Sequence, residues 1–201
     1  MRFEDLVNLP KNELPKRLRS GYPIDPHALD HTLYRGVSLG LPRWAERLTW
    51  KTFAKTFYRG KDGQLYGWNV RLQQTGIHGA IVPKQRNGAP RCFGFYGVTR
   101  ARGYTAPNDC DGGLSIQYRL GPNPRLHPIR WVRDPLVAIR PNDPTLLLGW
   151  SYVHLLGGIW TPSYFALKKE GALDYIPKIM QGWSAPQRLL LPEDRDENSA
   201  F

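Results

Sequence analysis

The chain has 201 residues with 41% hydrophobic and 12% aromatic content, and its formal net charge is +11. This composition excludes a disordered chain and suffices for one folded domain with a sizeable core. No apolar run approaches the roughly 18 residues of a membrane-spanning helix. Because acids and prolines stand near the N-terminus, where a secretion signal needs an apolar core, we expect a cytoplasmic protein.

Residues 1–48 are expected to form a helical appendage in short pieces. Asp25 is expected to cap a helix that continues through residues 27–34, with Gly36 just past its end. Residues 42–48 predict a second short helix after the next turn.

Residues 49–170 are expected to form an antiparallel sheet, because strand-like runs of aromatic and β-branched residues recur there between Gly, Pro, Asn and Asp. Residues 49–60 match either a helix or a strand, and we favour a strand. Clearer strands are expected at residues 65–74, 92–101, 113–120, 131–140, 146–156 and 163–169. The predicted fold class is mainly β, an antiparallel barrel or strongly curled sheet with short N-terminal helices.

Prolines and charges mark the ends of these elements. Pro135 interrupts the run at residues 131–140, which predicts a bulge or an edge strand. The sequence Pro-Asn-Asp-Pro at residues 141–144 predicts the tight turn of a hairpin. Residues 171–201 are expected to form a C-terminal extension with one more helical turn and a frayed, charged end.

Positive charge is concentrated in the middle third of the chain. From Gly63 to Arg133 there are ten Lys or Arg residues against two acids, Asp109 and Asp111. Nine of the ten are arginine, whose planar guanidinium favours recognition of oxyanions. The charge indicates an anionic partner, either nucleic acid, an acidic membrane surface or a carboxylate or phosphate ligand. A solvated basic surface without a specific partner is the alternative.

The aromatic run near the C-terminus carries a first candidate site. Trp150, Tyr152 and His154 are spaced two apart and therefore share one face of a strand. If that face lies inside a barrel, they would line a small-molecule pocket. Otherwise Trp150 and Tyr152 form an aromatic ladder in the core, with His154 near a rim.

Charged residues on two other strands form a second candidate site. Arg119 or Arg133 could hold a carboxylate or phosphate of a ligand through paired hydrogen bonds. The alternative is that Arg133 and Asp134 satisfy each other at a strand end.

His27 and His31 stand four apart but lack a third ligand, so we predict no metal site and no cofactor.

Two further patterns give no support for catalysis. Cys92 and Cys110 have no CxxC spacing, and we expect both to be free thiols. Ser151 lies in Gly-Trp-Ser-Tyr-Val rather than in a GxSxG elbow, so a serine hydrolase has no motif.

The pair Gly67 and Trp68 on an early strand, with the closing segments LLLGWSYV and YFALKKE, resembles the lipocalin-like, calycin-type barrels. In that family a helical piece precedes a meander of antiparallel strands around a hydrophobic pocket. The resemblance covers the chain from about Trp50 to Lys169. It implies binding of a lipid, a fatty acid, or a retinoid-like or porphyrin-like molecule, and it carries over no catalytic residue.

The function we expect from these patterns is binding of a small hydrophobic, anionic ligand in the barrel cavity. Trp68, Trp150, Tyr152 and His154 would contact the ligand, and Arg119 or Arg133 would fix its head group.

Two alternatives stay open. The first is an enzyme that acts on a hydrophobic substrate in the same cavity, with His154 as general acid or base and Tyr152 or Asp134 orienting it. The second, less favoured, is nucleic-acid binding through the basic middle third. The sequence makes no prediction of the oligomeric state.

Overall fold

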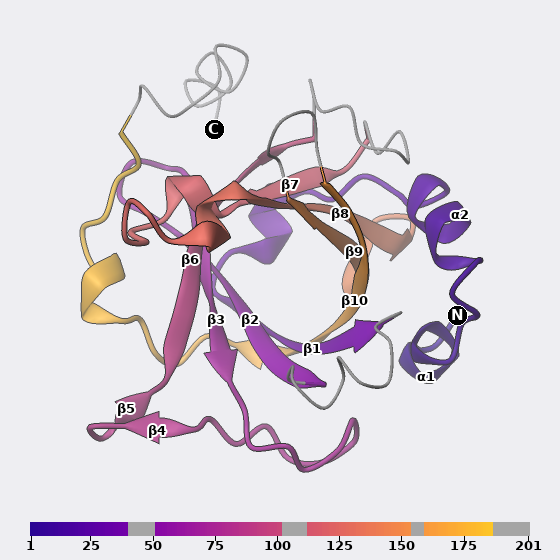
Figure 1. Ribbon diagram of the computed structural model, residues 1–201, viewed down its shortest axis with the longest axis horizontal. Helices are drawn as coiled ribbons and strands as arrows, with labels where there is room; N and C mark the ends of the chain where they lie inside the picture. The colour runs from indigo at the N-terminus through magenta and orange to yellow at the C-terminus, as the bar shows by residue number, and fades with distance from the viewer. Residues whose placement is uncertain (40–50, 102–111, 154–158, 187–201) are drawn as a thin grey trace.

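A computed structural model of the protein describes residues 1–39, 51–101, 112–153 and 159–186, without the side chains of residues 159–162. Within these ranges, eight antiparallel strands form a closed barrel (Figure 1). The predicted fold class, mainly β with an antiparallel barrel and short N-terminal helices, is confirmed. None of the described helices is long and apolar enough to cross a membrane.

The barrel strands neighbour one another in chain order, and the last strand closes the ring on the first. They are β1 (Thr32–Leu39), β2 (Thr52–Arg59), β3 (Leu65–Arg71), β6 (Cys92–Arg100), β7 (Leu114–Gln117), β8 (Val132–Arg140), β9 (Asp143–Val153) and β10 (Ile159–Ala172). A small hairpin of β4 (Gln85–Arg86) and β5 (Ala89–Pro90) extends away from the barrel (Figure 1). The helical elements are α1 (Phe3–Val7), α2 (Leu14–Arg19) and the 3-10 turns η1 (Pro26–Leu29), η2 (Tyr118–Leu120), η3 (Pro128–Trp131) and η4 (Lys178–Met180).

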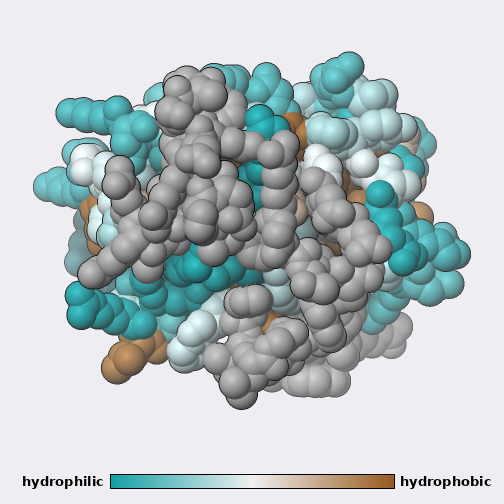
Figure 2. Space-filling model, turned by 90° about the horizontal axis from the view of Figure 1, so that it is seen from above, coloured by the Kyte–Doolittle hydropathy of each residue, from teal (hydrophilic) through white to brown (hydrophobic). Residues whose placement is uncertain are grey.

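Alternating side chains give the barrel a largely apolar interior and a partly apolar exterior. Inward residues such as Tyr34, Phe57 and Tyr96 pack together inside the ring. On the exterior, α1 and α2 cover the outward residues of β8, β9 and β10, with Leu14 and Leu18 fully buried between the layers. On the face seen in Figure 2, hydrophilic side chains cover most of the described surface.

The C-terminal segment covers another part of the exterior, over β3 and β6. Met180 of η4 is buried with Trp68 and Leu72. The indole Nε1 of Trp183 donates a hydrogen bond to the carbonyl of Leu120 at 3.0 Å. The helical turn predicted for the C-terminal extension is therefore present as η4.

The helix expected through residues 27–34 is wrong. Asp25 does cap a turn, since its carboxylate accepts the His27 backbone N–H at 2.9 Å, but only η1 forms and β1 follows. Pairing of β1 with both β2 and β10 outweighs the local helix signals. Gly36 lies inside β1 rather than after a helix, and a Cβ there would overlap the ring of Phe53.

The limits of the barrel differ accordingly from those expected. Strand β1 precedes the boundary predicted at residue 49, and β10 continues to Ala172. The strand favoured for residues 49–60 is confirmed as β2, and the turn expected at residues 141–144 connects β8 to β9. The second predicted helix, residues 42–48, lies outside the described residues.

Pro135 lies in β8 between two paired neighbours, so the expected edge strand is wrong. Its partner in β7 is Ser115, and the register shift of β8 against β9 falls between Ala138 and Arg140. The bulge expected at the proline is therefore also wrong. A residue in an antiparallel ladder directs its N–H toward one neighbour only, so proline costs a single hydrogen bond here.

Candidate functional site

A cavity of about 340 Å³ lies inside the barrel, toward the end where β1 finishes and β2 begins. Its volume is at the lower end of the range of roughly 300–1,000 Å³ typical of small-molecule sites. The apolar part of the wall comes from Phe53, Phe93, Ile129, Val132, Tyr164 and Phe165. The polar part comes from Ser38, Lys55, Asn69, Tyr118, Asp134, Ser151 and Ser163.

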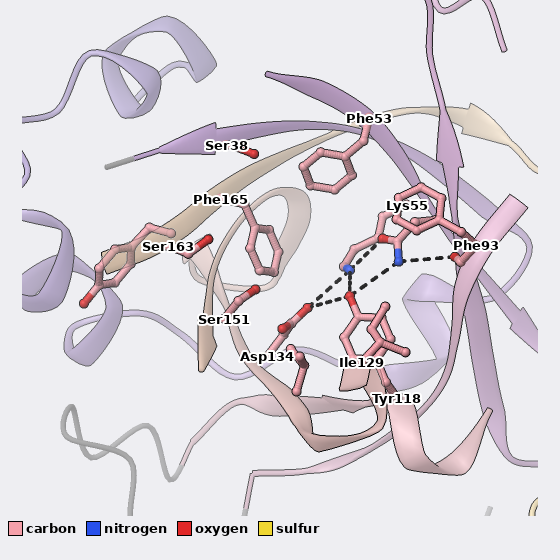
Figure 3. Close-up of a pocket in the computed structure, with 13 residues that line it drawn as sticks. Ser38, Phe53, Lys55, Phe93, Tyr118, Ile129, Asp134, Ser151, Ser163 and Phe165 are labelled. Carbon is pink, nitrogen blue, oxygen red and sulfur yellow. Dashed lines mark hydrogen bonds and ion pairs between the residues drawn. The ribbon is translucent and has the colours of Figure 1, made fainter. Parts of the chain in front are cut away.

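Four of the polar side chains form one connected cluster, shown in Figure 3. The Lys55 ammonium donates to Asn69 Oδ1 and to the Tyr118 hydroxyl, each at 2.9 Å. Its Nζ also lies 3.3 Å from Asp134 Oδ2. Tyr118 in turn donates to the same carboxylate oxygen at 3.0 Å. Two hydrogen bonds and one ion pair thus hold the Lys55 ammonium in the cluster.

The backbone of β6 sets the orientation of Asn69. Asn69 Nδ2 donates to the Gly94 carbonyl at 3.0 Å, which turns its oxygen toward Lys55. Gly94 has a φ of +54°, and a Cβ there would lie 2.8 Å from Asn69 Nδ2. Glycine therefore permits both the left-handed backbone and the close approach of the amide.

Aromatic rings surround the Lys55 ammonium. Its Nζ lies 4.8 Å from the ring centroid of Tyr96, 5.1 Å from that of Phe165 and 5.3 Å from that of Tyr118. Burial in this setting lowers the pKa of Lys55, and the negative charge of Asp134 opposes that effect. Burial, and next the charge of Asp134, raise the pKa values of Tyr96 and Tyr118. Both tyrosines are therefore neutral hydrogen-bonding groups at neutral pH.

One carboxylate oxygen of Asp134 can accept a further hydrogen bond. Its side chain is 1% exposed, and among the described residues its Oδ1 has no hydrogen-bond partner. A buried carboxylate oxygen without a donor costs free energy, which a donor on a bound molecule would offset. The cavity therefore combines an apolar wall with one strong acceptor.

Trp150 and Tyr152 share a face, as expected, but that face is the exterior of β9. They pack beneath α1 and α2, and their rings stack with centroids 4.9 Å apart. This placement matches the aromatic core ladder that the sequence also allowed. Ser151, between them in the chain, points to the cavity instead. His154 lies outside the described residues.

The other residues expected in the site lie away from the cavity wall. Trp68 is fully buried on the exterior of β3, beneath the C-terminal segment. Arg119 in η2 donates from Nε to Gln117 Oε1 at 2.9 Å. Arg133 donates from Nη1 to the carbonyls of Arg130 and Val132. Of the expected residues that the structure describes, Asp134 lines the cavity, and its partner is Lys55 rather than Arg133.

Lys55, Asn69 and Tyr118 were not among the expected site residues. For Lys55 a signal was present, because alternation in residues 52–59 places it on the same face as Phe53 and Phe57. A lysine between two phenylalanines on the buried face of a strand is rare without a partner. No local pattern indicated that Asp134, far away in the chain, would be that partner.

Comparison of the chain with protein-family models, with curated proteins and with solved structures finds no match in any of the three. Among the described residues, no group of three or more His, Cys, Asp or Glu side chains is placed to hold a metal ion. The function is therefore inferred from the geometry of the barrel.

Proposed function

We propose that the protein binds a small, largely hydrophobic molecule inside the barrel, in the manner of the lipocalin-like proteins. The observation that carries this proposal is the apolar cavity of about 340 Å³ with the unpartnered, buried Asp134 Oδ1 in its wall. Burial of apolar ligand surface supplies roughly 25 cal/mol per Å² before the cost of ordering. The modest volume favours a compact molecule over a long acyl chain.

The polar group of the ligand is proposed to be a hydrogen-bond donor, such as a hydroxyl or an amine. Asp134 Oδ1 is an acceptor, whereas the Lys55 ammonium already donates to Asn69 and Tyr118 and pairs with Asp134. A carboxylate or phosphate in the same place would have to displace one of these partners. The anionic head group expected from the charge of the chain is thus not required by this cavity.

Fluorescence titration with the neutral dye Nile red tests occupancy of the cavity. The variant Ser151→Phe fills the cavity from β9, and we expect it to weaken dye binding by about tenfold or more. Thr145→Phe adds the same ring at an exposed position of the same strand and should leave binding unchanged. Equal affinity of the two variants would show that the dye binds elsewhere.

A comparison of 1-naphthol with naphthalene tests the role of Asp134. A hydrogen bond to a charged group is worth about 1.5–3 kcal/mol, so naphthol should bind at least about tenfold more tightly. The preference should shrink in Asp134→Asn, whose folding is checked by circular dichroism. Equal affinity of wild type for the two compounds would exclude Asp134 as the polar anchor.

The buried Lys55–Asp134 pair favours a second candidate function, proton transfer to or from the bound molecule. A lysine with a lowered pKa beside a tyrosine and a carboxylate is typical of acid–base sites. Compounds extracted with solvent from the purified protein provide candidate substrates. Turnover that is lost in Lys55→Met and kept in His154→Gln would support Lys55, and the reverse pattern would support the histidine mechanism expected from the sequence.

A further inference from the structure

A second cleft, of about 420 Å³, lies beside the barrel, between the β4–β5 hairpin, the start of β6 and the segment around Tyr175. Three arginines line it, Arg71, Arg86 and Arg91, and no acidic residue is among its described lining residues. The cleft shares Phe93 with the barrel cavity. It is also part of the basic middle third of the chain, which the barrel cavity leaves unexplained.

Backbone hydrogen bonds hold the elements that carry these arginines. The Arg71 N–H donates to the Arg91 carbonyl at 3.0 Å, and the Arg71 carbonyl accepts the Lys84 N–H at 2.7 Å. Asn87 and Gly88 turn the hairpin with φ of +52° and +74°, the left-handed pair favoured in two-residue hairpin loops. These hydrogen bonds join the end of β3 to both arms of the hairpin. The backbone positions of the three arginines are therefore fixed relative to one another.

The arginine side chains concentrate positive charge. The guanidinium Cζ of Arg71 lies 5.5 Å from the ring centroid of Phe93, a cation–π contact that orients it. Within the described part of the chain, no carboxylate forms a salt bridge with Arg86 or Arg91. Burial, and next the positive charge of Arg91, lower the pKa of Arg71. Such an arrangement is stabilised by an anion between the guanidinium groups.

We propose that this cleft is a binding site for a phosphate group, held by Arg71, Arg86 and Arg91. Guanidinium forks match the oxygens of a phosphate, and a dianion neutralises more of the gathered charge than a carboxylate does. Phe93 and Tyr175 add ring surfaces on which an organic portion attached to the phosphate can pack. The site goes beyond the barrel cavity, whose ligand is bound through Asp134 and apolar contacts.

Isothermal titration calorimetry with inorganic pyrophosphate tests the site. We expect binding to weaken by about tenfold or more in the double variant Arg86→Gln/Arg91→Gln. The control Arg19→Gln/Arg125→Gln removes the same charge from two exposed positions outside the cleft and should bind like wild type. No binding to wild type at low salt, or equal loss in both double variants, would overturn the proposal. Thermal unfolding confirms that each variant is folded.

A second titration identifies the source of the phosphate. If the phosphate belongs to the molecule in the barrel, butyl phosphate displaces Nile red far better than butanol does, and the advantage disappears in Arg86→Gln/Arg91→Gln. If it belongs to a separate molecule, pyrophosphate binds without displacing the dye and butyl phosphate has no advantage over butanol. A failure of Nile red to bind would count against the barrel ligand alone, because the pyrophosphate titration does not depend on it.

Discussion

Lys55 on β2 and Asp134 on β8 meet across the interior of the barrel, from strands four places apart in the ring of eight. The 3.3 Å contact therefore links opposite walls rather than neighbouring strands. Two opposite charges buried at 2% and 1% side-chain exposure gain strong attraction but lose their hydration. Their free-energy balance is best measured by removing each partner in turn.

Removal of one partner should destabilise the fold more than removal of both. Lys55→Met or Asp134→Leu alone leaves a buried, uncompensated charge, which costs about 3–5 kcal/mol. The double variant replaces the pair by apolar groups and should recover most of this loss. Urea unfolding of the four proteins in a double-mutant cycle measures the coupling energy. Additive single losses would show that the two groups do not interact.

Alkaline pH should destabilise the protein through its buried tyrosines. Burial raises the pKa of Tyr34 above its ordinary value of 10.0, so its stabilising contribution is complete below pH 10 and is lost as pH rises further. Lys55 has the opposite sign, because its lowered pKa makes stability rise as pH approaches 10.5. We expect the tyrosines to dominate above pH 10, because burial raises the pKa values of four of them, Tyr34, Tyr66, Tyr96 and Tyr118.

The urea midpoint measured between pH 8 and pH 11 checks this expectation. In Tyr34→Phe the alkaline loss should be smaller, because the phenol that donates to the Pro144 carbonyl at 2.8 Å is absent. A midpoint that keeps rising through pH 11 would mean that Lys55 sets the pH dependence instead.

Cys92 should react slowly with alkylating reagents in the folded protein. Burial raises the pKa of its thiol from 9.0 to about 12. The thiolate is the reactive form, so the rate near pH 8 should fall by up to about a thousandfold relative to the unfolded chain. Iodoacetamide labelling, resolved by peptide mass spectrometry in the absence and presence of urea, measures the ratio. Similar rates in both states would contradict the burial of Cys92.

A methyl group at Gly149 should disturb the cavity wall. The Cβ of alanine there would overlap the ring of Phe165, which lines the cavity. Overpacking of this kind costs about 1–3 kcal/mol, and the displaced ring should also change Nile red affinity. Gly112→Ala is the matched control, because among the described residues the nearest atom to a Cβ there, on Pro23, is at an ordinary 3.8 Å. Unchanged stability of Gly149→Ala would show that Phe165 has room to move.

The short N-terminal helices should contribute measurably to the stability of the barrel. Leu18 of α2 is fully buried over the exterior core, and Leu18→Ala should cost about 2–5 kcal/mol in urea unfolding. Leu126 is 90% exposed, so Leu126→Ala should change stability little. Equal effects of the two substitutions would mean that α2 is not docked on the barrel in solution.

The strands were predictable because alternation in the sequence matches the alternation of a barrel wall. Alternation alone does not tell which of the two faces of a strand lies inside the barrel. In β9 both faces are apolar, because α1 and α2 pack against the exterior one. Trp150 and Tyr152 were therefore compatible with both positions. Strand β1 was missed because Asp25 and Gly36 resemble helix boundaries, while its stability comes from pairing with β10 at the far end of the chain.

The candidate site was less predictable than the fold. Its central contact joins Lys55 to a residue 79 positions later, since 134 − 55 = 79, and no local pattern encodes such a pairing. Charge type alone predicts Arg119 and Arg133 as ligand contacts, but both side chains donate to nearby backbone or amide oxygens. The sequence predicts Asp134 as an orienting group rather than as a ligand acceptor.

Closure of the ring by β1 and β10 also constrains how the chain folds. Thr32 pairs with Ala172, so this contact joins residues 140 positions apart (172 − 32 = 140). During synthesis, β1 must remain without its second partner until β10, about 140 residues later, has left the ribosome. Such non-local pairing slows folding and leaves strand edges exposed to other nascent chains. A truncation before β10 should therefore yield an aggregation-prone open sheet rather than a smaller barrel.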